Sequence, residues 1–426
     1  MAMERSRYNT ILAWGLLLFG FTLPLSKSAG NVLLFLIYPI AVAGVLYYED
    51  FKKAVVSSVK QPLLPAFSLY FFIALIGVIF TESYADGFHV ANKFFSLPAI
   101  YIMASVLLEA VPDKEQRYRN AENILMAFLI GLMVLNGIAL MTYLGIVGHK
   151  KFFLPLAPMS VHHIWFSNIN ALGLYTAASF LLFSQRGKLK GARSFLIVSM
   201  VLGVFCILLS LARTAWFGVA ITSVVMGFLV SRKKGVFYAM AAFAVLACIG
   251  VYSFIPIVHD RIGMIAKDIA QFSAGNPETS LGYRFMMWKA AIMMFLSNPL
   301  TGVGTGGFVS TMEAYVKTGQ FPESLLAFNQ PHNMYLFALA TNGIPGLAAL
   351  LFLYYESLKF ALPGLKAGGE RERLFAFLAA AATVHFMIAG LTDSFFNIQI
   401  LRYTFVFIMG VCVRTSSVQR SPLKGP

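Results

Sequence analysis

Two arginines and one histidine stand beside long apolar runs, where an ionisable side chain is expensive to bury and is therefore a candidate for function. Arg213 lies between two apolar runs, Arg284 begins an amphipathic stretch, and His332 opens a later apolar run. A guanidinium binds phosphate oxygens in a planar fork, and a neutral imidazole accepts protons near pH 7. These residue types predict an anion site beside a general base.

Each of the three residues also has a purely structural interpretation. Arg213, with Trp216 close by, fits an arginine that reaches up to the membrane surface. His332 fits a hydrogen-bonded histidine at a helix start. Arg284 is harder to explain in this way, because a cation is unfavourable at a helix N-terminus. An anionic ligand held by Arg284 and by free helix amides would remove that difficulty.

Further polar residues are expected on the same side of the membrane. His162 and His163 precede an apolar run with no Asp or Glu close by, which favours structural or acceptor-contacting roles over a metal site. Asp393 lies in a turn between two apolar runs. We expect it to orient His332 or to pair with an arginine, for which Arg402 is a candidate.

Two other features have weaker connections to chemistry. Lys27 is a lone cation in a short turn and a candidate for an additional phosphate contact. The glycine-rich segment 302–308 resembles a phosphate loop but lacks the Gly-Lys-Ser/Thr of that motif. We expect a tight turn with closely approaching backbones there, and a ligand contact only secondarily.

The elements that must position these residues are membrane helices. The chain has 426 residues, 58% of them hydrophobic and only 12% charged, whereas a soluble domain carries roughly a quarter charged residues. The net charge of +15 is not attributed to nucleic-acid binding, because no basic cluster is interleaved with aromatics. Excess Lys and Arg instead indicate cytoplasmic loops. The three cysteines lie inside apolar runs and are expected to be core residues.

The apolar runs predict an all-α polytopic membrane protein of about twelve transmembrane helices, both termini being cytoplasmic. The predicted spans are 10–25, 31–48, 63–81, 91–108, 124–147, 164–183, 195–211, 214–230, 236–255, 333–361, 374–391 and 395–413. With this topology, 22 of the 33 Lys and Arg fall on the cytoplasmic side.

The chain is thereby divided into three parts. Residues 1–255 hold spans one to nine, 256–331 form a long external loop with amphipathic helices, and 332–426 hold spans ten to twelve and a cytoplasmic tail. Within the loop, a helix over 281–297 is too short in its apolar part to span, and we expect it at the outer membrane interface.

Four motifs in this order resemble the O-antigen ligase and polymerase superfamily. They are LARTAW at 211–216, YRFMMW at 283–288, PLTGVGTGGF at 299–308 and PHNMYL at 331–336. The ligase pattern of His-Asn, nine residues and Gly-x-x-Gly is matched by His332, Asn333, Gly343 and Gly346. Ala348 stands where that pattern has a different small or aromatic residue.

The resemblance implies an integral-membrane glycosyltransferase of the GT-C type in the bacterial inner membrane. Its donor would be an O-antigen on undecaprenyl diphosphate in the periplasm, and its acceptor a sugar hydroxyl of lipid A–core. His332 matches the general base, Arg213 and Arg284 match the arginines that hold the donor diphosphate, and Asp393 matches an acidic position. No DxD metal motif is present, so we expect an inverting reaction without metal or cofactor.

Two related enzymes and one transporter are the alternatives to the ligase. An O-antigen polymerase would share donor, fold and chemistry but would extend a second lipid-linked glycan, and the spacing after His332 favours the ligase. A protein O-glycan transferase usually has a larger external C-terminal region. A twelve-helix secondary transporter would place ionisable residues near the midplane and show internal repeats, whereas the candidates here gather on one face and no repeat is found.

Overall fold

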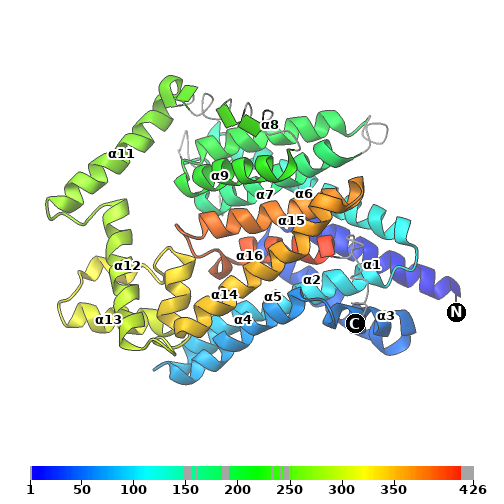
Figure 1. Cartoon of the computed structure of the whole chain (residues 1–426), viewed down its shortest axis with the longest axis horizontal. Coiled ribbons are helices and arrows are strands. Elements are labelled where there is room, and N and C mark those ends of the chain that lie inside the picture. Colours follow the sequence, from blue (N-terminus) through cyan, green and yellow to red (C-terminus); the bar gives the residue numbers. More distant parts are fainter. Residues whose placement is uncertain are drawn as a thin grey trace.

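The computed structural model describes residues 2–147, 155–158, 161–184, 191–231, 235, 237–238, 241–242, 249–250 and 252–413. Its long helices run mostly side by side (Figure 1). They are α1 (Ala2–Thr22), α2 (Lys27–Tyr47), α3 (Glu49–Val59), α4 (Leu63–Gly77), α5 (Tyr84–Glu109), α6 (Lys114–Tyr143), α7 (His163–Phe183), α8 (Arg193–Leu209), α9 (Arg213–Val230), α11 (Pro256–Ser273), α12 (Ser280–Ser297), α13 (Gly307–Lys317), α14 (Met334–Ala367), α15 (Glu370–Ala389) and α16 (Gln399–Val413). Short 3-10 helices occupy Val78–Phe80, Glu323–Ala327 and Phe395–Asn397.

Among the described residues, eight helical segments are long and apolar enough to cross a membrane. They are α2, α4 with the 3-10 turn that follows it, α5, α6, α7, α9, α14 and α15. The apolar helices α8 and α16 have only 17 and 15 residues, fewer than the roughly 20 that a ~30 Å hydrocarbon core requires. Half of the predicted span at 236–255, including Cys248, lies outside the described residues. The chain is thus a multi-pass helical membrane protein, and the number twelve stays a prediction.

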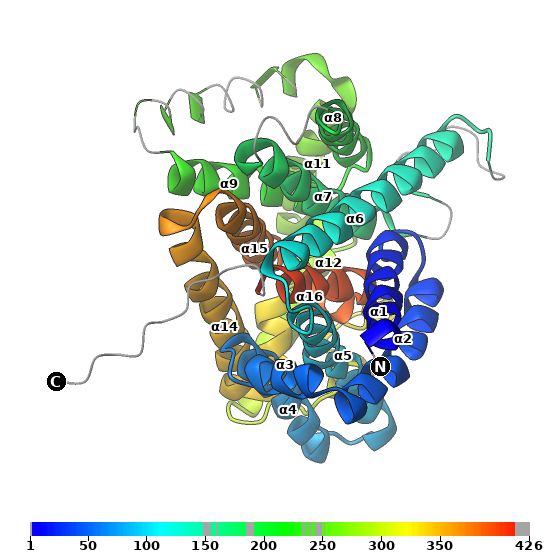
Figure 2. The same ribbon diagram turned by 90° about the vertical axis from the view of Figure 1, so that its right-hand side faces the viewer.

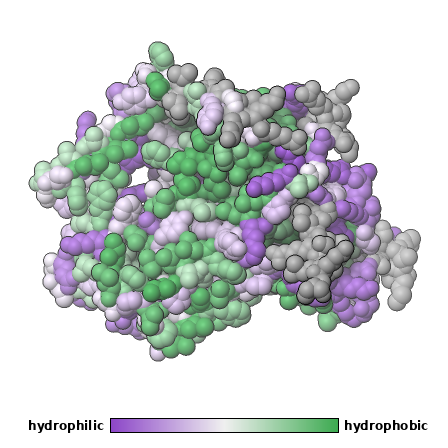
Figure 3. Space-filling view, viewed as in Figure 1, coloured by the Kyte–Doolittle hydropathy of each residue, from purple (hydrophilic) through white to green (hydrophobic). Residues whose placement is uncertain are grey.

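The outer surface has the pattern of a membrane protein. Phe35, Val201 and Phe228 are each more than half exposed, which water would disfavour and lipid tails would not. Figure 3 shows hydrophobic residues across the middle of the molecule and hydrophilic ones toward its two ends. The helix axes run between those ends (Figure 1), as expected for membrane-spanning helices.

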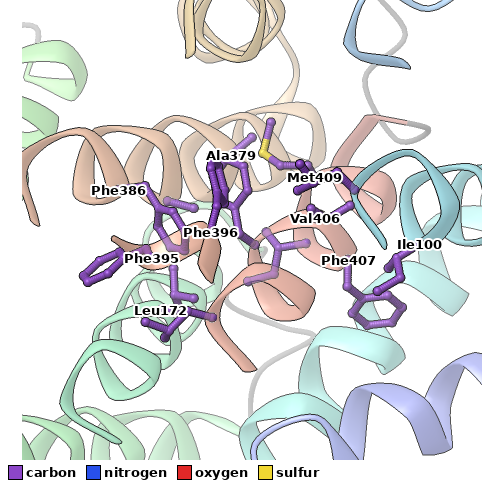
Figure 4. Packing of buried hydrophobic residues seen from close by; sticks show 14 of the residues in the cluster. Ile100, Leu172, Ala379, Phe386, Phe395, Phe396, Val406, Phe407 and Met409 are labelled. Atoms are coloured by element: carbon purple, nitrogen blue, oxygen red, sulfur yellow. The ribbon is translucent and has the colours of Figure 1, made fainter. Parts of the chain in front are cut away.

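Helix α16 lies at the centre of the bundle. Figure 2 shows it surrounded by α5, α6, α14 and α15, and its residues from Ile400 onward are almost all buried. Aromatic packing joins it to α15: the ring centroids of Phe386 and Phe405 are 4.5 Å apart, and those of Phe386 and Phe395 are 5.1 Å apart. Figure 4 shows Phe386, Phe395 and Phe396 close together at the turn between α15 and α16.

The prediction that Arg402 pairs with Asp393 is wrong. Arg402 is buried in α16, where its Nε donates to Ser96 Oγ at 2.8 Å and its Nη1 donates to the Phe396 carbonyl. The side chain points from α16 toward α5, because residue 402 is already one turn inside the helix. Neutral oxygens of the protein interior satisfy this buried cation, as intramembrane arginines require.

Three helices lie over one end of the bundle. Helices α11, α12 and α13 lie at the left in Figure 1, where α12 crosses the direction of the spanning helices. The helix predicted over 281–297 is confirmed as α12, which begins with the hydroxyl of Thr279 accepting from the Gly282 amide at 3.0 Å. It ends at Asn298, before Pro299.

The glycine-rich segment is a tight backbone turn, as predicted. Positive φ angles occur at Gly302, Gly304 and Gly306, which only glycine adopts without strain. A Cβ on Gly304 would lie 2.4 Å from the Thr81 amide nitrogen. The Val303 amide donates to the Ala340 carbonyl at 2.8 Å. The segment therefore holds α12 and α13 against α4, α5 and α14.

The second half of the His-Asn-x9-Gly-x-x-Gly pattern has a structural role in this docking. Gly343 interrupts α14 with φ 61° and ψ −155°. A Cβ there would lie 2.4 Å from the Pro299 carbonyl oxygen, and the Ile344 amide donates to the same oxygen at 2.9 Å. The kink lets the turn after α12 pass close to α14.

Candidate functional site

His332 lies at the start of α14 in a strained conformation. Its φ is +50°, and Leu211 is the other non-glycine residue with positive φ in the described part of the chain. Such strain persists where surrounding contacts enforce it and is concentrated at functional sites. His332 Nδ1 lies 3.1 Å from Asp393 Oδ1. Because a carboxylate accepts hydrogen bonds, Nδ1 carries the proton and Nε2 is left as a proton acceptor.

Asp393 is held in place by the turn that follows α15. The carboxylate is buried, and its Oδ1 also accepts from the Ser394 amide at 2.8 Å and from Gln330 Nε2 at 3.4 Å. Its position is thus independent of the histidine. The structure places Asp393 beside His332, one of the two arrangements that the sequence predicts.

Asn333 has a local structural role. Its side-chain oxygen caps α14 by accepting from the amides of Tyr335 and Leu336, both at 3.0 Å. Its Nδ2 donates to the Leu391 carbonyl at 3.0 Å, and the next amide, that of Met334, donates to Gly390 at 2.8 Å. These bonds hold the start of α14 against the end of α15 and so keep the histidine near its carboxylate.

Arg213 is the first residue of α9. Its Nη2 lies 3.4 Å from Ser280 Oγ, while its Nη1 is buried and has no hydrogen-bond partner among the described residues. A buried unpaired N–H group is costly. The guanidinium therefore has donor capacity left for an anion.

Arg284 extends from α12 to the turn that bears Asp393. Its Nη1 donates to the Thr392 carbonyl at 2.6 Å. Burial lowers the pKa of Arg284 from its ordinary value; the charge of Asp393 raises it and that of Arg261 lowers it. Arginine remains protonated even so, and the burial means that a bound anion would be weakly screened.

Arg261 is a functional candidate that the sequence reasoning missed. It lies on α11, and its Nε donates to the Leu211 carbonyl at 3.3 Å. This contact stabilises the strained turn before Arg213. The sequence offers one indication of this role: Arg261 lies on a helix that begins with Pro256, in the same loop as Arg284.

These side chains line one cavity of about 360 Å³ at the loop-covered end of the bundle. It is lined by His162, His163, Ile164, Leu211, Ala212, Arg213, Thr214, Phe217, Arg261, Ile265, Ser280, Leu281, Tyr283, Arg284, Met287, Phe328, His332 and Thr392. Three guanidiniums line it and no carboxylate does, while the neighbouring Asp393 is engaged by the histidine. The cavity can hold a multiply charged anion next to a proton acceptor.

The remaining predicted residues divide into two groups. His162 and His163 line the cavity, and their ring centroids lie 4.3 Å apart with the planes tilted by 32°. The Nδ1 of His162 accepts from the Ile164 amide at 3.4 Å. Lys27 does not line it, because its Nζ lies 4.1 Å over the Trp165 ring instead. In the described ranges, no cluster of three or more His, Cys, Asp or Glu could hold a metal ion.

A match to a known protein family covers the arginines and the histidine of this site. Residues 198–351 match the family model described as O-antigen ligase. An uncharacterized protein of Haemophilus influenzae is 24% identical over 363 residues, which cover 84% of this chain and 86% of that relative. The matched segment holds all three cavity arginines and His332. Residues 198–351 are therefore similar to the O-antigen ligase family, and this match confirms the resemblance to the O-antigen ligase and polymerase superfamily.

Proposed function

We propose that this chain is an O-antigen ligase that transfers a glycan from undecaprenyl diphosphate to a sugar hydroxyl of lipid A–core in lipopolysaccharide biosynthesis. The observation that carries the proposal is the convergence of three arginines and a carboxylate-oriented histidine on one cavity. The family supports a membrane enzyme that acts on lipid-linked glycans. The donor, acceptor and residue roles below are parts of the proposal.

The arginines would hold the donor. In this proposal Arg213 and Arg284 bind the diphosphate, and Arg261 adds a third positive charge. The charge on the diphosphate grows as the bond to the sugar breaks. Fixed cations in a partly buried site stabilise that charge without reorganising at the moment of reaction.

His332 would activate the acceptor. The acceptor oxygen attacks the anomeric carbon and forms the new glycosidic bond, while the bond from that carbon to the diphosphate oxygen breaks. The hydroxyl proton passes to His332 Nε2, and undecaprenyl diphosphate leaves with the bonding electrons. Asp393 keeps the proton on Nδ1 and stabilises the imidazolium that forms. A single displacement inverts the anomeric configuration.

The proposed location is the bacterial inner membrane with the site facing the periplasm. Most described cations of the loops lie at the end opposite the site, among them Lys52, Lys60, Arg117 and Arg371. By the positive-inside rule that end is cytoplasmic. The chain would then comprise spans at 1–255, a periplasmic segment at 256–331, and spans with a cytoplasmic tail at 332–426.

Reconstitution with two acceptors tests the proposal against its closest rival. The protein in liposomes receives undecaprenyl-diphosphate-linked glycan with EDTA, and lipid A–core is either present or absent. Glycan on lipid A–core, with no lengthening of the lipid-linked chains, is the result we expect. Longer glycans on undecaprenyl diphosphate in both samples would make the chain a polymerase and leave the site assignments unchanged.

An imposed ion gradient is the control for a transporter. Transfer that proceeds without a gradient excludes transport as a requirement. Strict dependence on a gradient, with glycan appearing unmodified on the other side, would contradict the proposal.

A further inference from the structure

A second and larger cavity lies at the opposite end of the bundle. Its volume is about 1050 Å³. The middle of α1, the junction of α2 and α3, the loop from α5 to α6 and the start of α6 line it. None of these elements contributes to the arginine cavity. The site proposed for glycan transfer therefore leaves this cavity unexplained.

The polar lining of this cavity is almost entirely uncharged. It is made by Asn9, Thr10, Asp113, Gln116, Asn120 and Asn123. Gln116 Nε2 donates to Asn120 Oδ1 at 2.8 Å. The amide N–H groups of the three asparagines donate to no partner in the described part of the chain. The lining thus combines several free donors with a single carboxylate.

No lysine or arginine lines the cavity, although it lies at the basic end of the molecule. Two cations on its border are held by carboxylates, Arg117 by Glu109 at 2.8 Å and Arg119 by Glu115 at 3.3 Å. The Asp113 carboxylate accepts from two amides at the start of α6 and is exposed. It can therefore accept a further bond from a ligand cation.

The rim of the cavity is aromatic and open. Trp14 is 59% exposed and Tyr47 is 81% exposed, and such side chains collect where a membrane meets water. A small apolar extension continues inward, lined in part by Leu12, Leu16 and Phe51. Polar groups at the end and apolar groups toward the middle match an amphipathic ligand standing upright in the bilayer.

We propose that this cavity binds one phospholipid with an ammonium headgroup, of the phosphatidylethanolamine class, from the leaflet at the basic end. The ammonium pairs with Asp113, and the rim aromatics lie close enough to contribute cation–π contacts. The asparagine amides donate to the phosphate. The glycerol and the first acyl carbons lie along the apolar wall of the cavity, against Ala13, Leu17 and Ile124.

Charge complementarity selects this headgroup. A purely anionic lipid would bring its charge next to Asp113 with no cation in the lining to offset it. A lipid diphosphate is disfavoured for the same reason more strongly. A zwitterion satisfies both the carboxylate and the free amides.

The test is lipid binding by the full chain in nanodiscs, with dioleoyl phosphatidylethanolamine competing against dioleoyl phosphatidylglycerol. Native mass spectrometry counts the lipids that remain bound. We expect one phosphatidylethanolamine to be retained preferentially by wild type. Asp113→Asn keeps the helix cap, since Asn and Asp cap equally well, and should lower that preference about threefold, the size of a partly exposed ion pair.

Asp86→Asn is the matched control. Asp86 is an exposed carboxylate in the first turn of α5, away from the cavity, so its removal should leave the preference unchanged. A second variant, Asn123→Leu, should reduce retention of both lipids because it removes a phosphate donor. Wild type that prefers phosphatidylglycerol, or an equal preference in wild type and Asp113→Asn, would overturn the proposal.

Discussion

The two cavities lie at opposite ends of one helix bundle and have opposite linings. The end covered by α11–α13 has fewer loop cations than the opposite end, yet its cavity is lined by three arginines and no carboxylate. The other end is basic, yet its cavity is lined by amides and one carboxylate. The net charge of a face sets the orientation of the protein in the membrane. The charge inside a cavity instead determines which ligand it can hold.

The two cavities also differ in the backbone strain of the residues that line them. Leu211 and His332, the two non-glycine residues with positive φ in the described part of the chain, both line the arginine cavity. Neither lines the amide cavity. Strain maintained by neighbouring contacts is typical of a site that must hold reacting groups in place, whereas a lipid site needs only shape and charge.

Removing Arg284 should strongly reduce glycan transfer at the arginine cavity and leave lipid binding at the opposite cavity unchanged. Arg284→Ala is expected to lower glycan transfer about 100-fold, because a fixed donor to the developing charge is lost. Transfer is measured in liposomes, and lipid retention is measured in parallel. Loss of phosphatidylethanolamine retention in this variant would show that the two cavities do not function independently.

Neutralising the carboxylate behind the histidine should have a similar or somewhat smaller effect. Asp393→Asn is expected to reduce transfer by roughly 10- to 100-fold, since the imidazolium loses its counter-charge and Nδ1 its acceptor. The binding of undecaprenyl diphosphate, measured by competition with a labelled donor, should stay close to wild type. A variant that transfers normally would remove Asp393 from the mechanism.

The third arginine should matter less. Arg261→Gln is expected to reduce transfer about tenfold, because one of three cations is lost and the Leu211 carbonyl keeps a possible donor. Raising the salt concentration should narrow the gap between variant and wild type, since Arg261 is only partly buried. A complete loss of transfer would instead mean that Arg261 contributes at least as much to transfer as is proposed for Arg284.

The glycine-rich turn borders neither cavity, so a substitution there should affect the stability of the whole protein and not one cavity more than the other. Gly304→Ala places a Cβ 2.4 Å from the Thr81 backbone, and we expect it to lower the free energy of unfolding by about 1–3 kcal/mol. Gly319→Ala is the matched control, because its φ is also positive (+74°) but its Cβ would meet nothing within 4 Å. Thermal unfolding should show a clearly larger loss for Gly304→Ala.

The sequence predicts the helices better than it predicts their contacts. Apolar runs give most of the long helices, and Asn298-Pro299 gives the end of α12, because these depend on local composition and backbone chemistry. Arg402 shows the limit. Its partner depends on which way α16 faces α5, and hydropathy contains no information about that rotation.

The same limit applies to the site. Arg213, Arg284 and His332 were recognisable as ionisable residues beside apolar runs, and the structure brings them to one cavity. Arg261 was not recognisable in this way. Charged residues are common on amphipathic loop helices, and only the fold shows that this one lines the cavity. Lys27 is the opposite case, because its ammonium lies over the Trp165 ring and not in the cavity. Residues more than a hundred positions apart in the sequence give no sign of such a contact.

Glycan transfer by His332→Ala, with donor binding measured on the same preparation, tests the central claim most directly. His89→Ala is the control, because His89 is an exposed histidine on α5 that lines neither cavity. We expect His332→Ala to bind the lipid-linked donor like wild type and to transfer glycan roughly 10²- to 10⁴-fold more slowly, with partial recovery when imidazole is added. Transfer at the wild-type rate would contradict the assignment of His332 as the base and with it the account of this site.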